Sequence, residues 1–260
     1  MTDFGIRDPF VGIMKGVIEK IAPALHVSDL THAIPPQNIQ VGAFILSASF
    51  RYFPERTLFV AVVDPGVGSA RRIIYAETPK YRFLAPDNGL LGMIFDEEEP
   101  TQVVEVSNSK YFLHPTSHTF HGRDIFAPVA AYLSRGVKPE ELGPTINPGD
   151  LSPLPFTKPY QDEKGEWHGE IVYIDQFGNL ITNFSQNQLG LNGKETVELR
   201  VKNRAVKGLA ESYTQGNGEP IVVLDSFGTL EIALFKGSAQ DFLNVKQGEK
   251  VSLRCQTCYS

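Results

Sequence analysis

The sequence predicts an α/β domain followed by a small all-β domain. Three observations lead to this fold class. Strand-like and helix-like segments alternate over residues 1–150, helical spacing disappears beyond Gly169, and a proline-rich stretch separates the two regions. Alternating strands and helices are typical of α/β architecture, whereas short strands with turns between them are typical of barrels and sandwiches.

The first region contains the helices and a buried sheet. Apolar residues recur at helical spacing over residues 10–22 and again over residues 41–48, which predicts two amphipathic helices. Residues 57–63 form a continuous apolar run rich in β-branched side chains, which suits a strand covered on both faces. Residues 72–77 and 101–106 read as further strands and residues 124–133 as a helix. We therefore expect a mostly parallel sheet.

The second region begins after a linker. Residues 151–168 contain Pro153, Pro155 and Pro159 and then the polar run Asp162–Gly165, a composition that predicts an exposed, extended segment. Beyond it, strands are expected at 169–175, 179–184, 196–202, 220–225, 229–235 and 250–254. The predicted organisation is an α/β domain (1–150), a linker (151–168) and a barrel-like all-β domain (169–260).

Composition limits the classes of partner. Hydrophobic residues make up 42% of the chain and charged residues 21%, the profile of an ordinary globular protein. The net charge of −6 and the absence of a basic stripe argue against nucleic acid, and no apolar run is long enough for a membrane span. The start does not resemble a signal peptide, so we expect a cytoplasmic protein. Its two cysteines, Cys255 and Cys258, are expected to form an inert tail.

Polar clusters interrupt the apolar segments where ligands bind in α/β sheets, at strand ends and loops. Taken singly, each has a simpler interpretation. The loop from Asp64 to Ser69 could be a strand-exit turn, Asp87–Gly89 a turn with a helix cap, and His121 a structural histidine. The histidines lack metal-binding spacing, so no metal is expected. The clusters are Thr2–Asp8, Asp64–Arg72, Ala85–Gly89, Thr119–Asp124, Asp175–Asn179 and Asp225–Gly228.

Together, these clusters closely resemble the motifs of the S-adenosyl-L-methionine hydroxide adenosyltransferases, relatives of the bacterial fluorinase and chlorinase. The similarity continues through Thr31–Pro36 and Ser226–Ala233 and covers nearly the whole chain. It implies an enzyme that hydrolyses S-adenosyl-L-methionine (SAM) to adenosine and L-methionine, with no cofactor. Family members usually carry a short apolar strand before Thr2; without it, we expect Asp3 to lie at a frayed terminus beside an exposed sheet edge.

The resemblance also implies residue roles. Asp64, Arg71 and His121 match the group that activates water for attack on C5′ of the ribose. Asp3 would accept both ribose hydroxyls, Asp8 and Asp175 would face the methionine ammonium, and Ser226 its carboxylate. Asn179 would read the adenine edge, Phe177 and Tyr213 are candidate stacking rings, and Glu231 lies in the matching nucleoside-binding strand. The implied assembly is a homotrimer with the site between subunits.

Three alternatives remain open at this stage. A halogenase of the same superfamily would require Tyr at position 64 and Ser at position 122, where this chain has Asp64 and Gly122, and a long insertion between Arg72 and Ala85 that it lacks. A non-catalytic adenosine or SAM sensor would have no use for a water-activating group. A phosphate-ester hydrolase would need a metal set or a phosphate loop.

Overall fold

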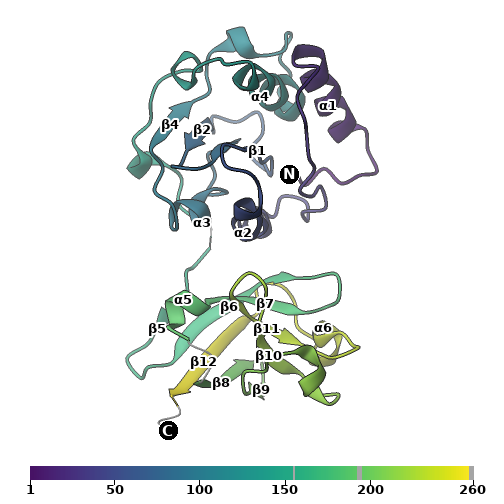
Figure 1. Ribbon diagram of the computed structural model, residues 1–260, viewed down its shortest axis with the longest axis vertical. Helices are drawn as coiled ribbons and strands as arrows, with labels where there is room; N and C mark the ends of the chain where they lie inside the picture. Colours follow the sequence, from purple (N-terminus) through teal and green to yellow (C-terminus); the bar gives the residue numbers. More distant parts are fainter. Residues whose placement is uncertain (155, 192–194, 258–260) are drawn as a thin grey trace. The chain divides into compact units, whose positions relative to one another are not determined.

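The computed structural model describes residues 1–154, 156–191 and 195–257 (Figure 1). Clustering of contacts divides the chain into two compact units, Met1–Pro155 and Phe156–Ser260. The division falls inside the segment that the sequence marks as a linker. Each unit has its own hydrophobic core, and the two are described separately below.

The first unit contains a mixed four-stranded sheet in the order β1-β3-β2-β4. Strand β3 runs parallel to β1, whereas β2 is antiparallel to both β3 and β4. The expectation of a mostly parallel sheet is therefore wrong. The reason is the connection between β2 and β3, a tight turn closed by a 2.9 Å hydrogen bond from Thr78 N to Tyr81 O, which is too short for a parallel crossover. The strands are β1 (Leu58–Val60), β2 (Ile73–Glu77), β3 (Arg82–Pro86) and β4 (Gln102–Glu105).

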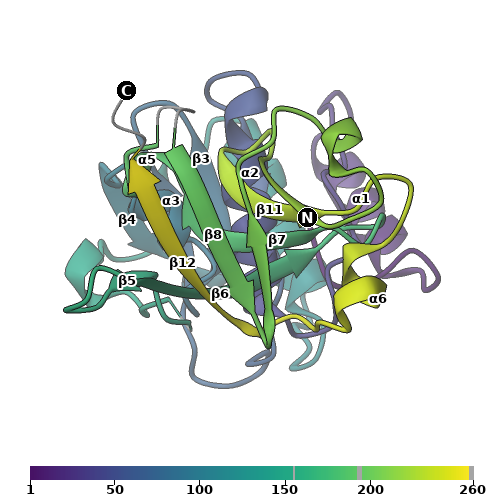
Figure 2. The same ribbon diagram turned by 90° about the horizontal axis from the view of Figure 1, so that it is seen from below.

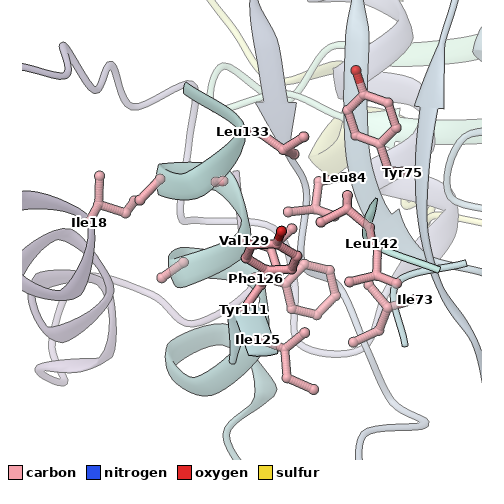
Figure 3. Close-up of a cluster of buried hydrophobic side chains, with 14 of the residues drawn as sticks. Ile18, Ile73, Tyr75, Leu84, Tyr111, Ile125, Phe126, Val129, Leu133 and Leu142 are labelled. Carbon is pink, nitrogen blue, oxygen red and sulfur yellow. The ribbon is translucent and has the colours of Figure 1, made fainter. Parts of the chain in front are cut away.

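Helices cover this sheet. They are α1 (Phe10–Ile21), α2 (Ile39–Ser49), α3 (Gly92–Phe95) and α4 (Ala127–Ser134), the last preceded by a π-helical turn (Gly122–Phe126). The predicted helices at 10–22 and 41–48 match α1 and α2, and the helix expected at 124–133 begins as the π turn. Helices α1 and α4 lie side by side (Figure 1) and pack on the sheet through a shared core, in which Phe126 and Leu84 are fully buried (Figure 3).

The first residues of the chain are held in place, contrary to the expectation of a frayed terminus. The Met1 ammonium donates to Val60 O at 2.8 Å, and Val62 N donates to Met1 O at 2.9 Å. Thr2 forms a parallel bridge with Val62 and is only 2% exposed. Backbone pairing beyond the end of β1 thus fixes the segment that carries Asp3.

The second unit is a nearly closed antiparallel barrel (Figure 2). Its strand order is β10-β11-β7-β6-β12-β8-β9, and the bridge between Ala210 and Val223 links the segment after β9 back to β10. Strand β5 pairs with β6, so part of the predicted linker is strand. The elements are β5 (Tyr160–Gln161), β6 (Trp167–Ile174), β7 (Leu180–Ser185), β8 (Glu195–Val201), β9 (Arg204–Lys207), β10 (Ile221–Leu224), β11 (Thr229–Ala233) and β12 (Lys250–Thr257), with helices α5 (Gln186–Leu189) and α6 (Ala239–Leu243).

The cysteine tail is partly structured. Cys255 lies on β12 opposite Val197 of β8 and is exposed, so the chain at this point is a barrel strand and not a frayed end. Cys258 lies outside the described residues.

Candidate active site

Asp64 follows the buried run that extends β1. Ala61, Val62 and Val63 are each at most 2% exposed, so apolar packing on both sides fixes where the strand ends. Asn88 donates its side-chain N–H to Val63 O at 2.9 Å and anchors this end against the next loop. The strand therefore delivers the Asp64 carboxylate to a defined position.

The loop after Asp64 folds Arg71 back onto that carboxylate. The Arg71 Nε atom lies 2.9 Å from both Asp64 oxygens, and Nη2 also donates to Oδ2. Inside the loop, Ser69 Oγ donates to Gly66 O at 2.6 Å and accepts from Arg71 N at 3.2 Å. The Asp64 and Arg71 side chains are 5% and 11% exposed, so water screens this ion pair little.

His121 joins the pair from a distant segment. Its Nδ1 atom lies 2.8 Å from Arg71 Nη2, so the guanidinium bridges the carboxylate and the imidazole. Gly68 permits this approach. Its φ is +78°, and a Cβ at this position would lie 2.3 Å from His118 O, so any other residue would push the two loops apart. The sequence shows this glycine but not that it contacts the histidine loop.

The environment favours neutral His121. Burial lowers its pKa below the usual value, and the adjacent Arg71 charge lowers it further, while Asp64 partly opposes both effects. Because an arginine N–H can only donate, Nδ1 must be the acceptor, and the neutral ring then carries its proton on Nε2. Protonation of Nδ1 would set two donors against each other and break this contact.

The segment that carries Asp3 lies against the histidine loop. Phe4 packs on Phe120 with ring centroids 5.9 Å apart, and a Cβ on Gly122 would come within 3.1 Å of a Phe4 ring carbon. Asp3 accepts a hydrogen bond from Gln37 N at 2.7 Å. Asp8 is exposed in the loop that leads to α1. The first unit thus gathers Asp3 and the three predicted catalytic residues into neighbouring loops.

Two turns of the second unit share one architecture, which the sequence analysis did not recognise as a repeat. In turn 175–179, Asp175 Oδ1 accepts the backbone N–H groups of Phe177 and Asn179, both at 2.9 Å. Turn 225–229 repeats this pattern, with Asp225 Oδ1 accepting two backbone N–H groups at 2.8 and 2.9 Å. The shared pattern Asp-x-Phe-Gly-Asn/Thr is the signal that could have revealed it. Each turn carries a phenylalanine, 75% exposed at position 177 and 49% at position 227.

Glu231 lies on β11 between these two turns. It pairs with Val223 of β10 and with Ile181 of β7, and it is 4% exposed. The Tyr213 hydroxyl acts on its carboxyl group and lowers the carboxyl pKa, which only partly offsets the effect of burial. Burial raises the pKa of Glu231 to about 7, and the Asp225 and Asp175 carboxylates add to the shift. Burial also raises the pKa of Tyr213 to about 12.

The remaining predicted residues are distributed over the second unit. Asn179 is buried and donates its side-chain N–H to Asp175 Oδ2 at 2.8 Å, and Ser226 lies in the second turn. Within the described ranges, no three His, Cys, Asp or Glu side chains are grouped to hold a metal ion, and no helix is long and apolar enough to cross a membrane. A cavity of about 400 Å³ lies elsewhere in the first unit, beside β1, and is not lined by the Asp64 group.

Comparison with known proteins agrees with these motifs. The family model for the SAM hydroxide adenosyltransferase N-terminal domain matches residues 1–143, and the model for the C-terminal domain matches residues 169–252. The chain is 37% identical to an (R)-S-adenosyl-L-methionine hydrolase from Thermus thermophilus (97% of each chain covered), and 26% identical to a fluorinase from an Actinoplanes species (97% of this chain and 95% of the relative).

The fold agrees as well. A crystal structure of an uncharacterised conserved protein from Thermotoga maritima superposes with a TM-score of 0.88 at 35% identity, covering 97% of each chain. A second, of a conserved hypothetical protein from T. thermophilus, has a TM-score of 0.79 at 34% identity and covers 98% of this chain and 97% of its own. The motifs, the family models and these relatives lead to one conclusion: the chain belongs to the SAM hydroxide adenosyltransferase family.

Proposed function

We propose that the protein hydrolyses S-adenosyl-L-methionine to adenosine and L-methionine. The observation that carries this proposal is the contact chain Asp64–Arg71–His121, formed by three separate segments in a family whose members at 30–37% identity are named SAM hydrolases. A sulfonium is already an excellent leaving group. What the reaction requires from the protein is an oxygen nucleophile, held in line with the C5′–S bond and relieved of its proton.

In the proposed mechanism, the oxygen of water attacks C5′ and the C5′–S bond breaks. The bonding pair stays on sulfur, which leaves as the neutral thioether of methionine. Arg71 remains protonated and stabilises the charge that develops on the attacking oxygen. Its contacts with Asp64 and His121 use Nε and Nη2, so Nη1 is the donor left for the water. The Asp64 carboxylate accepts the proton and passes it to solvent.

The substrate contacts follow the family motifs. We assign the ribose hydroxyls to Asp3, the ammonium to Asp8 and Asp175, the carboxylate to Ser226, and adenine to Asn179 with the rings of Phe177 and Tyr213. These residues belong to both units, which supports a homotrimer in which neighbouring subunits complete each site. No cofactor enters this mechanism. We place the reaction in the cytoplasm, because a chain with two cysteines, both among its last six residues, suits a reducing compartment.

Water is favoured over halide as the nucleophile. The Asp64 carboxylate at the site would repel an anion, and Gly122 is tightly packed at the position where a halogenase would have a serine. A Cβ at position 122 would lie 3.1 Å from Met14 Sδ and 3.1 Å from the rings of Phe4 and Phe120. A halide pocket at this position would require these three side chains to move.

The test is chromatography of the purified protein incubated with SAM, with and without 100-fold excess chloride or fluoride. Adenosine and methionine in equal amounts support hydrolysis, whereas 5′-halo-adenosine supports the halogenase. Unchanged substrate, with binding seen by calorimetry, supports the sensor.

A further inference from the structure

We propose that Glu231 contacts the ammonium of the substrate's methionine part through its Oε1 atom and is the residue that couples ligand charge to pH. This inference rests on the proposed function and assigns to Glu231 a contact that the motifs leave unspecified. Four features of the second unit support it: an unsatisfied buried oxygen, a surrounding negative field, a geometry unsuited to metal ions, and a carboxyl group that titrates near neutrality.

The unsatisfied atom is the first feature. Glu231 Oε1 is buried and has no hydrogen-bond partner among the described residues. Leaving a buried acceptor without a donor costs on the order of 1–3 kcal/mol, so such atoms are rare unless a ligand supplies the donor. Tyr213 acts on the carboxyl group, but Oε1 has no hydrogen-bond donor among the described residues.

The surrounding field is the second feature. The titratable groups that act on Glu231 are Tyr213 and the Asp175 and Asp225 carboxylates, while its neighbours on β10 and β7, Val223 and Ile181, are apolar. None of these three carboxyl groups is in an ion pair within the described part of the chain. The region therefore holds negative charge without a cation of the protein to balance it.

The two aspartates create this field, and both already accept hydrogen bonds within their own turns. In each turn, Oδ1 already accepts two backbone N–H groups, and Oδ2 accepts the side chain of Asn179 or of Thr229. Glu231 Oε1 differs from them, because no described group donates a hydrogen bond to it. Glu231 pairs with Ile181 of β7, so these two side chains lie on the same face of the sheet.

An organic ammonium suits this arrangement better than a metal ion. Hard cations require six to eight oxygen ligands or near-octahedral geometry, and the described residues contain no cluster of carboxylates and imidazoles that could provide it. An ammonium needs only an acceptor for each N–H and a negative field. It would satisfy Oε1 and balance the aspartates at once.

A cation beside Glu231 must lower the pKa of its carboxyl group. In the free protein that pKa is about 7, because burial and two like charges oppose ionisation. Below pH 7 the free carboxyl is protonated, and binding of the ammonium must expel its proton. Affinity for the ammonium ligand is therefore expected to rise with pH and to level off above about pH 7.

The experiment compares two ligands by calorimetry at pH 5.5 and pH 7.0. S-Adenosyl-L-homocysteine carries the ammonium but is not a sulfonium, and adenosine has no amino-acid tail. Both pH values lie below the ordinary pKa of an α-amino group, so the ammonium stays charged. We expect the Kd of S-adenosyl-L-homocysteine to fall about tenfold between the two pH values and the Kd of adenosine to stay constant.

Two variants complete the test. Glu231→Gln should bind S-adenosyl-L-homocysteine weakly at both pH values, with no pH dependence. Glu170→Gln is the matched control, because Glu170 is buried in the same barrel but paired with Lys250 at 2.6 Å, and it should keep the wild-type pH dependence. Melting curves at each pH confirm that both variants are folded.

Three outcomes would overturn the assignment. The first is a pH dependence that persists in Glu231→Gln. The second is an affinity for adenosine that falls as pH rises, which would mean that protonated Glu231 contacts the base. The third is a protein that hydrolyses SAM but does not bind S-adenosyl-L-homocysteine. Product chromatography on the same preparation separates these results from failure of the proposed function, in which SAM is not cleaved at all.

Discussion

The Asp64 group of the first unit and the Glu231 region of the second differ in how their charges are balanced. In the Asp64 group, the carboxylate is joined to Arg71 and through it to His121, so the charges of Asp64 and Arg71 balance each other before any ligand arrives. In the Glu231 region, Asp175, Asp225 and Glu231 lie near one another, and none of them forms an ion pair with a described residue. Burial and the two aspartate charges raise the pKa of Glu231 to about 7. The contrast supports the two proposals made above: the Asp64 group is arranged in advance for the nucleophile, and the Glu231 region gains its missing cation from the ligand.

The largest expected effect comes from breaking the paired group. Arg71→Ala should lower kcat by 10- to 1000-fold, because it removes both the charge at the water and the link to His121. Arg71→Lys should recover only part of this loss, since a point charge cannot reproduce the guanidinium fork. Single-turnover rates with a titrated concentration of active sites provide the measurement.

The adjacent arginine provides the control for this prediction. Arg72 also pairs with an aspartate, at 2.6 Å from Asp87, but has no contact with the Asp64 group among the described residues. Arg72→Lys should leave kcat near the wild-type value. If Arg71→Ala has a lower melting temperature but its folded fraction has a normal kcat, the Asp64–Arg71 pair only stabilises the turn.

A double variant tests whether the residues act as a unit. Asp64→Ala combined with Arg71→Ala should lower kcat little more than either single substitution.

The second prediction concerns acid. Because the pKa of His121 lies below its usual value of 6.5, the imidazole is neutral at pH 7 and the Arg71 contact is intact. As the pH falls through that pKa, Nδ1 gains a proton and kcat should drop by about tenfold per pH unit. The kcat profile between pH 5 and pH 8, measured at saturating SAM, shows this directly. A flat profile, or one unchanged by His121→Gln, would remove the histidine from the catalytic group.

A third prediction tests whether loop contact holds the group together. Gly68→Ala should cost roughly 1–3 kcal/mol of stability and lower kcat more than it raises KM, because the new Cβ would strike His118 O. Gly136→Ala separates backbone strain from collision: its φ is +93°, yet nothing lies within 4 Å of the added Cβ. It should lose stability only. Equal effects of both variants on kcat would argue against a role for the loop contact.

The smallest expected effect concerns stability in the second unit. A carboxyl whose pKa is raised on folding binds more protons in the native state, so its contribution to stability is lost as pH rises from about 4.5 to about 7. Glu231→Gln removes this penalty and should stabilise the ligand-free protein at pH 8 by ~1–2 kcal/mol, with little change at pH 5. Urea denaturation at both pH values tests the sign. Destabilisation at pH 8 would mean that the ionised carboxylate has a partner in the free protein.

The sequence was most informative where periodicity and motif agreed. Helix α1, the apolar run before Asp64 and most barrel strands could be predicted, because each has a length and pattern that only one element fits. Strand β3 was missed, and with it the antiparallel β2–β3 pair, because a four-residue turn carries a weaker signal than a long apolar run. Tertiary pairing, and not local propensity, also decided the structure of the first residues.

The candidate site, like the fold, could be predicted only in part. The residues Asp64, Arg71 and His121 could be named from motifs, and the structure places them in contact, but their catalytic roles stay predictions. What could not be predicted is how the loops meet: the Gly68–His118 approach and the lone Oε1 atom of Glu231 depend on packing between segments far apart in sequence. The family prediction itself is confirmed by both family models.

The twin turns of the barrel differ in how freely they can change. A Cβ at Gly178 would lie 2.2 Å from Ser238 Oγ, the side chain that caps α6, so this turn is locked to the helix. Gly228 also has a positive φ, but no atom lies within 4 Å of a Cβ added at this position. An asparagine, which tolerates this backbone region, fits there with little cost to the barrel. The second turn is therefore the site where protein engineering, or natural drift, can diversify ligand choice while the rest of the scaffold stays constant.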